Sequence, residues 1–136
     1  MSELGEPLDA KDRALIREAQ AALRAGFLRH RHTVAAAVRT RRGAIYRGLN
    51  VDGIHGPCAE PVALGAAFTA GDRSIESMVS VCRRGRALPV LSPCGNCRQL
   101  LLDYAPRATV IVRFGDGRVA RMGVAESLPG AFQTFG

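Results

Sequence analysis

Three cysteines and one glutamate are the residues of this 136-residue chain that are best suited to chemistry. Cys94 and Cys97 are three positions apart at the expected start of a helix, so both thiolates can bind one ion. Cys58, at the expected start of another helix, can provide a third ligand. Three protein ligands leave one tetrahedral position for water, which is typical of a catalytic zinc site. The spacing therefore predicts one Zn²⁺ per chain.

Glu60 follows Cys58 by two positions and is the expected catalytic residue. Side chains at a helix start lean toward the N-terminus, so both residues can reach the metal region. A carboxylate there can take a proton from attacking water and return it to a leaving amine. Two other interpretations stay open: a structural site with Cys82 or His55 as a fourth ligand, and an acid that merely suits a helix start. We favour catalysis, and we interpret Cys82 as a small core residue.

The elements that must position these residues alternate between helices and strands. Hydrophobic periodicity predicts helices over residues 10–26, 58–70 and 95–104. It predicts strands over residues 32–39, 44–48, 76–82 and 108–113, and a further one within 114–122 after an Asp-Gly turn. Asp9 and Asp12 have the spacing of a capping box before the first helix. We expect a single α/β domain over residues 1–136, a three-layer α/β/α sandwich with a five-stranded mixed sheet.

Four short stretches carry a resemblance to a known family. They are Gly-Pro-Cys-Ala-Glu at 56–60, Ser-Pro-Cys-Gly-Asn-Cys-Arg-Gln at 92–99 with its continuation to Asp103, Gly-Leu-Asn-Val at 48–51 and Glu-Ser-Leu-Pro at 126–129. With them the chain resembles the cytidine deaminase family from about Leu8 to Phe132, and within it the blasticidin-S deaminase branch. The three-cysteine zinc site with a non-ligating glutamate fits this resemblance. It implies the cytidine deaminase-like fold, hydrolytic deamination and a homotetramer with active sites near subunit borders.

The resemblance also implies substrate-binding residues. Asn50 and Asp52 occupy the positions of an Asn-x-Glu pair that holds ribose hydroxyls in nucleoside deaminases, with aspartate shorter than glutamate by one methylene. The Ala59 backbone and the Ser92 carbonyl region resemble the family's contacts to the amide edge and the amino group of the base. His32 stands where nucleoside deaminases usually place a phenylalanine against the pyrimidine.

Two further positions follow from the same resemblance. Phe132 is similar to a C-terminal aromatic residue that closes the pocket in family members. Three thiolates and Zn²⁺ sum to a net charge of −1, which the positive ends of two helices and Arg98 are expected to offset. Some three-cysteine relatives carry an arginine directly after Cys-Ala-Glu, but this chain has Pro61 there. Arg98, beside Cys97, is therefore expected to bear more of this role.

The charge of the chain raises the question of a nucleic-acid partner. The net charge is +7, from 18 arginines and one lysine against 12 acidic residues, but the arginines are scattered along the sequence. The chain has no Trp, two Tyr and five Phe, so few side chains can stack on bases. We expect no nucleic-acid partner. The sequence has no apolar run of membrane-spanning length and no secretory signal, so we expect no membrane contact and a cytoplasmic location.

The leading hypothesis is an aminohydrolase that acts on a small pyrimidine compound and releases ammonia. Its candidate substrates are cytidine, deoxycytidine and a nucleoside of the blasticidin S type. The first alternative is a free base or another kind of aminated heterocycle, because the short segment between Asn50 and Cys58 is expected to change the size of the pocket. A polynucleotide-editing deaminase, suggested by the positive charge, is another. A non-enzymatic module stabilised by zinc would require a fourth protein ligand.

Overall fold

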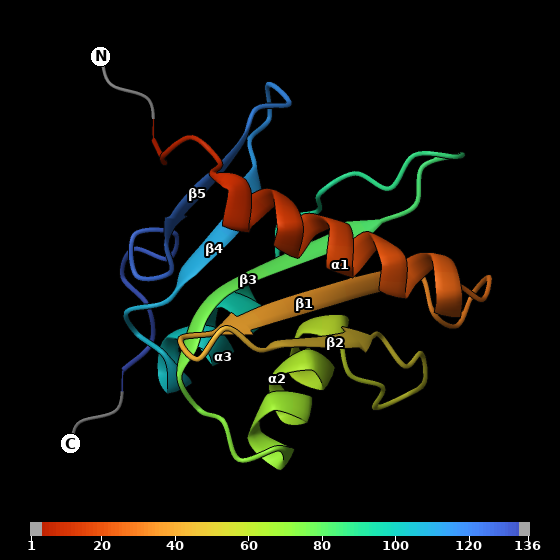
Figure 1. Cartoon of the computed structure of the whole chain (residues 1–136), viewed down its shortest axis with the longest axis horizontal. Coiled ribbons are helices and arrows are strands. Elements are labelled where there is room, and N and C mark those ends of the chain that lie inside the picture. Colours follow the sequence, from red (N-terminus) through yellow and green to blue (C-terminus); the bar gives the residue numbers. More distant parts are fainter. Residues whose placement is uncertain (1–3, 134–136) are drawn as a thin grey trace.

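A computed structural model of the chain describes residues 4–133 and contains one sheet with helices on both of its faces (Figure 1). Three helices and five strands alternate along the chain. In order they are α1 (Ala10–Gly26), β1 (Val34–Thr40), β2 (Ile45–Leu49), α2 (Ala59–Thr69), β3 (Ile75–Cys82), α3 (Gly95–Tyr104), β4 (Thr109–Arg113) and β5 (Val119–Gly123).

The sheet is mixed, with the strand order β2-β1-β3-β4-β5. Strand β1 pairs antiparallel with both β2 and β3, and β4 pairs antiparallel with β5. Strands β3 and β4 are parallel, and the crossover between them contains α3. The crossover from β2 to β3 contains α2. Both helices that carry the candidate ligands therefore lie on connections between strands.

Alternation along the strands decides which helix covers which face of the sheet. Ala35 and Ala37 of β1 belong to the same apolar cluster as Leu15 and Leu23 of α1. The intervening residues, represented by Ala36, belong to the cluster formed with α2 and α3. Because successive side chains of a strand point to opposite faces, α1 covers one face and the two ligand-bearing helices cover the other. The predicted α/β/α sandwich with a five-stranded mixed sheet is confirmed.

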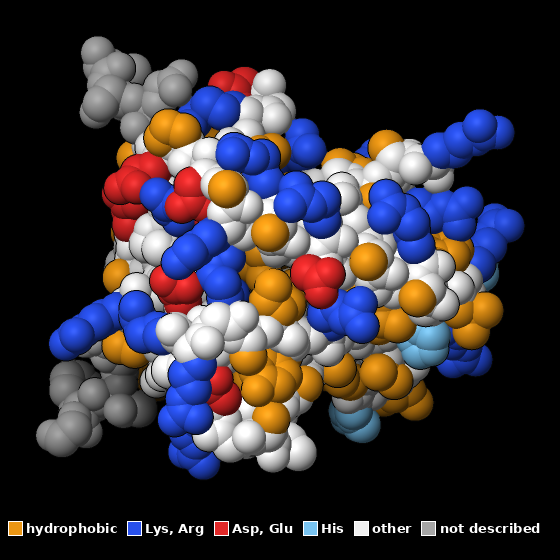
Figure 2. Space-filling view, viewed as in Figure 1, with side chains coloured by type: hydrophobic (Ala, Val, Ile, Leu, Met, Phe, Trp, Pro, Cys, Tyr) orange, Lys and Arg blue, Asp and Glu red, His pale blue; other side chains and the backbone are white. Residues whose placement is uncertain are grey.

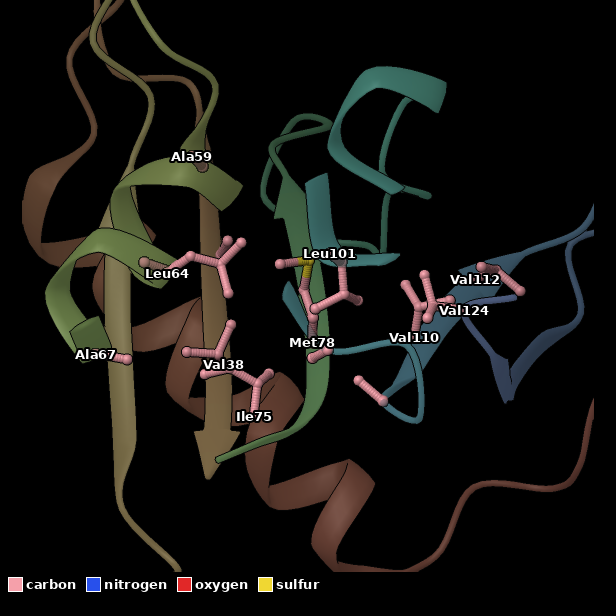
Figure 3. Packing of buried hydrophobic residues seen from close by; sticks show 14 of the residues in the cluster. Val38, Ala59, Leu64, Ala67, Ile75, Met78, Leu101, Val110, Val112 and Val124 are labelled. Atoms are coloured by element: carbon pink, nitrogen blue, oxygen red, sulfur yellow. The ribbon is translucent and has the colours of Figure 1, made fainter. Parts of the chain in front are cut away.

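The core on the ligand side fixes α2 and α3 against the sheet. Figure 3 shows Leu64 of α2 beside Val38, and Leu101 of α3 beside Met78 of β3. Leu64 and Leu101 are no more than 1% exposed, and complete burial of such a side chain contributes about 1.5–3 kcal/mol. A Cβ on Gly48 of β2 would lie 2.5 Å from the amide nitrogen of Ala63, so glycine there allows α2 to approach the strand closely.

Local sequence explains where the helices begin and end. Asp9 accepts a hydrogen bond from the Asp12 amide at 2.8 Å, and the Asp12 carboxylate accepts one from the Asp9 amide at 3.0 Å, which confirms the capping box before α1. Pro61 is the third residue of α2, where an amide hydrogen would have no partner within the helix. Helix α3 ends at Tyr104, two residues before Pro106.

The predicted elements agree with the structure, and their boundaries differ by a few residues at most. The largest deviation within the first hairpin is at β1, which begins at Val34 and not at residue 32. Residues 28–32 form a tight turn instead, in which the Leu28 and His32 backbones exchange two hydrogen bonds and His30 has a φ of 66°. Within residues 4–133, no helix has the length and apolar character needed to cross a membrane.

Candidate metal centre and active site

The three predicted ligands lie together. The sulfurs of Cys58, Cys94 and Cys97 are all within 4.8 Å of one another. Thiolates at 2.3 Å from a tetrahedral Zn²⁺ lie about 3.8 Å apart, so this spacing fits one zinc ion with little adjustment. Cys97 is buried, whereas Cys58 and Cys94 are exposed. The three sulfurs therefore present one closed side toward the core and one accessible side toward solvent.

Two helix N-termini converge on these sulfurs. Cys58 is the N-cap of α2 and Cys94 is the N-cap of α3, with nearly the same backbone conformation (φ −64° and −66°, ψ 169° for both). Neither cap side chain forms a hydrogen bond to its helix. The partial positive charge of a helix N-terminus stabilises a nearby thiolate. The two helix N-termini therefore help to balance the net charge of −1 that three thiolates and Zn²⁺ carry together.

The chemistry of Cys97 also fits a metal site. Burial, the nearby charge of Glu60 and the neighbouring Cys94 raise the pKa of the Cys97 thiol well above its usual range. A buried thiol in this setting stays protonated unless a cation compensates the negative charge. The three cysteines thus suit a dication that binds thiolate ligands, such as Zn²⁺.

Within residues 4–133, the ligand group consists of these three cysteines without a fourth Cys, His, Asp or Glu. Neither Cys82 nor His55 belongs to it, although both were alternatives for a structural site. Cys82 is partly exposed at the end of β3 and lines a surface cavity, so its interpretation as a buried core residue was wrong. Cys82 is the last residue of β3, and the apolar pattern of this strand does not reveal that its end borders a cavity.

A cavity of about 450 Å³ opens beside the metal centre. Glu60 lines it although only 4% of the residue is exposed, and both Cys58 and Cys94 contribute to the same wall. Its volume is within the range of small-molecule sites. The cavity brings the metal position and a buried carboxylate to one place, as the sequence predicted.

Four of the predicted substrate-binding residues line this cavity, namely Asn50, Asp52, Ala59 and Ser92. The Asn50 side-chain oxygen accepts hydrogen bonds from the amides of Thr33 and Val34 at 2.7 and 3.0 Å, which leaves its NH₂ group for a ligand. The Ser92 hydroxyl is held by the Arg113 backbone, donating at 3.0 Å and accepting at 2.8 Å. Only the main chain of Ser92 is therefore free to face a substrate.

His32 and Phe132 do not line the cavity. The His32 ring donates from Nδ1 to the Asn50 carbonyl oxygen at 2.8 Å and faces a different hollow beside β2. It thereby holds the segment that carries Asn50. Phe132 is 71% exposed and lies against the end of α3, where its carbonyl oxygen accepts a hydrogen bond from Gln99.

Arg98 supports the turn that contains two of the ligands. Its Nε donates to the Pro93 carbonyl oxygen at 2.8 Å, and its Nη1 donates to the Ser127 carbonyl oxygen at 2.9 Å. These bonds tie the segment before Cys94 to the turn that follows β5. Arg98 directly follows Cys97 in α3.

Sequence reasoning missed the apolar walls of the cavity. Val34 and Leu91 line it, but nothing in the motifs around Cys58 and Cys94 identifies either residue as part of the site. Both also line a second, larger cavity. Their positions depend on pairing between distant strands and loops, and a single apolar residue in the sequence gives no signal for such a role. Gly56 also lines the cavity, and its place in the same motif as Cys58 is a sequence signal that could have identified it.

Comparison with known proteins places this geometry in a family. The family described as "Cytidine and deoxycytidylate deaminase zinc-binding region" matches residues 9–113. Blasticidin-S deaminase of Bacillus cereus is 32% identical over 108 residues, covering 74% of this chain and 76% of that protein. Cytidine deaminase of Halalkalibacterium halodurans is 33% identical over 123 residues, covering 87% and 91%. The crystal structure of cytidine deaminase from Burkholderia pseudomallei superposes with a TM-score of 0.72 at 30% identity, covering 88% of this chain and 98% of that one. The chain therefore belongs to the zinc-binding family of cytidine and deoxycytidylate deaminases.

Proposed function

We propose that this enzyme hydrolytically deaminates the cytosine-type ring of a small nucleoside, with cytidine, deoxycytidine and blasticidin S as the candidate substrates. The observation that carries the proposal is the joint presence of the three cysteines and the buried Glu60 on one cavity of small-molecule size. The similarity to a blasticidin-S deaminase and to a cytidine deaminase supports a pyrimidine ring as the group that reacts.

Cys58, Cys94 and Cys97 would hold the zinc ion, which supplies Lewis acidity toward a water molecule. We assign proton transfer to Glu60. Its carboxylate accepts a proton from the attacking water and passes it to the ring nitrogen next to the reacting carbon. It then accepts the remaining proton of the added hydroxyl group, as the new carbonyl forms, and gives it to the amino group that leaves. Water adds at the carbon and ammonia departs, so the amidine becomes an amide and the carboxylate regains its starting charge. Burial of Glu60 excludes bulk water as a competing proton donor.

The remaining walls of the cavity suit the rest of a nucleoside. The free NH₂ group of Asn50 and the carboxylate of Asp52 are polar groups that can bind sugar hydroxyls. The Ala59 amide and the Ser92 carbonyl group are assigned to the polar edge of the ring. The apolar side chains Val34 and Leu91 provide surfaces for the faces of a flat ring.

We assign other roles to three residues that do not line this cavity, His32, Arg98 and Phe132. We assign His32 to positioning Asn50 through its hydrogen bond to that residue's carbonyl. Arg98 is assigned both to fixing the Pro93 turn and to offsetting thiolate charge. Phe132 is exposed beside α3 and does not line this cavity, so we assign it to a neighbouring subunit's cavity in the proposed homotetramer. We further propose a cytoplasmic enzyme without a nucleic-acid or membrane partner.

The decisive experiment is a measurement of ammonia release from a panel of aminated compounds. The panel contains cytidine, deoxycytidine, blasticidin S, free cytosine and adenosine, and the Cys94→Ala variant serves as the control without a complete ligand set. We expect turnover of at least one pyrimidine nucleoside and loss of that turnover in the variant. Ammonia release from adenosine alone would show that the reacting ring is a purine and not a pyrimidine. If zinc-loaded protein released ammonia from none of the compounds, the proposal would be refuted.

A further inference from the structure

A second cavity, of about 780 Å³, adjoins the candidate active site. Val34 and Leu91 line both cavities. Three arginines line the second cavity, Arg29, Arg83 and Arg84, and its lining contains no aspartate or glutamate. The charged residues of the first cavity have the opposite sign, since they are Asp52 and Glu60.

Strand pairing explains why these arginines meet. Val34, at the start of β1, pairs directly with Cys82, at the end of β3. The turn that precedes β1 and the hairpin that follows β3 therefore leave the sheet side by side, at the end of the sheet where α1 also ends (Figure 1). Arg29 belongs to the turn, and Arg83 and Arg84 begin the hairpin. The arrangement depends on regular sheet geometry and not on a chance meeting of loops.

The positive charge of this cavity is available to a ligand. Arg29, Arg83 and Arg84 form no ion pair with an acidic residue of the described range 4–133. Arg83 is held in place: its guanidinium lies 4.4 Å from the centroid of the Phe27 ring, and its Nε donates to the Gly85 carbonyl oxygen at 3.0 Å. Figure 2 shows Lys and Arg side chains gathered over this end of the molecule.

We propose that the second cavity binds an anionic group, a phosphate or a carboxylate, carried by the same substrate molecule whose ring reacts beside Glu60. This inference rests on the proposed function and narrows the substrate to an anionic nucleoside. Guanidinium groups bind the oxygens of phosphate and carboxylate through paired hydrogen bonds, and a pre-positioned arginine loses little freedom on binding. A nucleoside can extend from the reacting ring, past Val34 and Leu91, to the arginines.

The surroundings favour a small anion over the backbone of a nucleic acid. A single-stranded polynucleotide needs aromatic faces on which successive bases stack. Phe27 is the aromatic residue of this cavity, and Arg83 already covers its ring. The exposed aromatic residues Tyr104 and Phe132 lie on and beside α3, and they line other cavities.

Paired substrates test the proposal. We would compare kcat/KM at low ionic strength for cytidine, cytidine 5′-monophosphate and cytidine 5′-carboxylate, with a cytosine-containing oligonucleotide as a fourth substrate. One of the two anionic nucleosides should exceed cytidine by at least about tenfold, as expected for hydrogen bonds to charged groups. In the double variant Arg29→Gln/Arg84→Gln this preference should fall by at least about tenfold, and the preferred anion identifies the group that is bound.

The double variant Arg24→Gln/Arg107→Gln is the matched control, because it removes the same net charge from exposed positions outside the cavity. It should keep the preference. Equal kcat/KM for neutral and anionic nucleosides, or an unchanged preference in Arg29→Gln/Arg84→Gln, would overturn the inference. Faster deamination of the oligonucleotide would assign the arginines to nucleic acid instead. Calorimetric titration with uridine and uridine 5′-monophosphate detects the anion site even without turnover, so failure of the proposed function remains distinguishable.

Discussion

The backbone of Gly56 lies against the carbonyl oxygen of Val51, so closely that a Cβ on residue 56 would overlap that oxygen. The Val51 amide donates to the Pro57 carbonyl oxygen at 3.0 Å, and the Gly56 amide donates to the Gly53 carbonyl oxygen at 3.1 Å. These contacts close the loop between β2 and α2 immediately before Cys58. The position of a metal ligand therefore depends on the absence of a side chain two residues earlier.

Replacement of Gly56 with alanine should displace this loop and lower the free energy of unfolding by about 1–3 kcal/mol, the usual cost of overpacking. Zinc content should fall as well, because Cys58 moves with the loop. Gly53→Ala is the matched control, since a Cβ there would meet its nearest neighbour at 3.9 Å. Denaturant unfolding and metal analysis measure the two effects. Equal stability and zinc content in the two variants would contradict this role.

The purified protein should contain about one zinc per chain, because three thiolates at two helix N-termini form a chelate. Cys94→Ala should lose most of the metal, since it leaves two of the three sulfurs. Cys82→Ala should keep it, because Cys82 lies outside the group of three. Elemental analysis of the three proteins gives the answer, and zinc content that is indifferent to Cys94 would refute the ligand assignment.

Glu60→Gln should lower kcat by at least about 10²-fold, the lower range for general acid–base catalysis. Glutamine preserves the size of the side chain but cannot accept the proton of the attacking water. Zinc content should stay unchanged, which separates proton transfer from metal binding. Glu126→Gln, an exposed change of the same kind, serves as the control and should leave the rate intact. Near-normal turnover in Glu60→Gln would mean that another group carries the proton.

Asp52 should contribute to the choice between a nucleoside and a free base. If Asn50 and Asp52 bind sugar hydroxyls, free cytosine leaves both groups without partners, and kcat/KM for cytidine should exceed that for cytosine. Asp52→Ala should reduce this preference by roughly tenfold, equivalent to one hydrogen bond to a charged group. Competition kinetics with both substrates measures the preference. A higher kcat/KM for cytosine in the unaltered enzyme would show that the ribose assignment is wrong.

The predicted elements agreed with the structure because their signals are local. The capping pair Asp9 and Asp12 marked the start of α1, and Pro106 marked the limit of α3. The metal centre was predictable for a related reason. Cys94 and Cys97 share a helix turn, and helix geometry alone brings their sulfurs together. Cys58 could be added because the motif around it places it at another helix start.

Residues that act through contacts distant in the chain were harder to predict. Phe132 was expected at the pocket, but its position depends on how the segment after β5 returns along α3. His32 was expected against the ring, but the turn that ends at this residue directs its hydrogen bond to Asn50. A sequence position specifies the kind of side chain present. The direction of that side chain is set by the packing of the surrounding elements.

The sequence by itself determined the order of helices and strands and the three clustered cysteines, and it predicted Glu60 as the proton carrier, because each of these rests on residue types within short motifs. The tertiary structure decided the arginine-lined cavity. Arg29 and Arg83 are more than fifty positions apart in the chain, and the pairing of Val34 with Cys82 brings them to one hollow beside the metal centre. Strand pairing depends on the burial of whole faces of the sheet, so no short stretch of sequence contains that information.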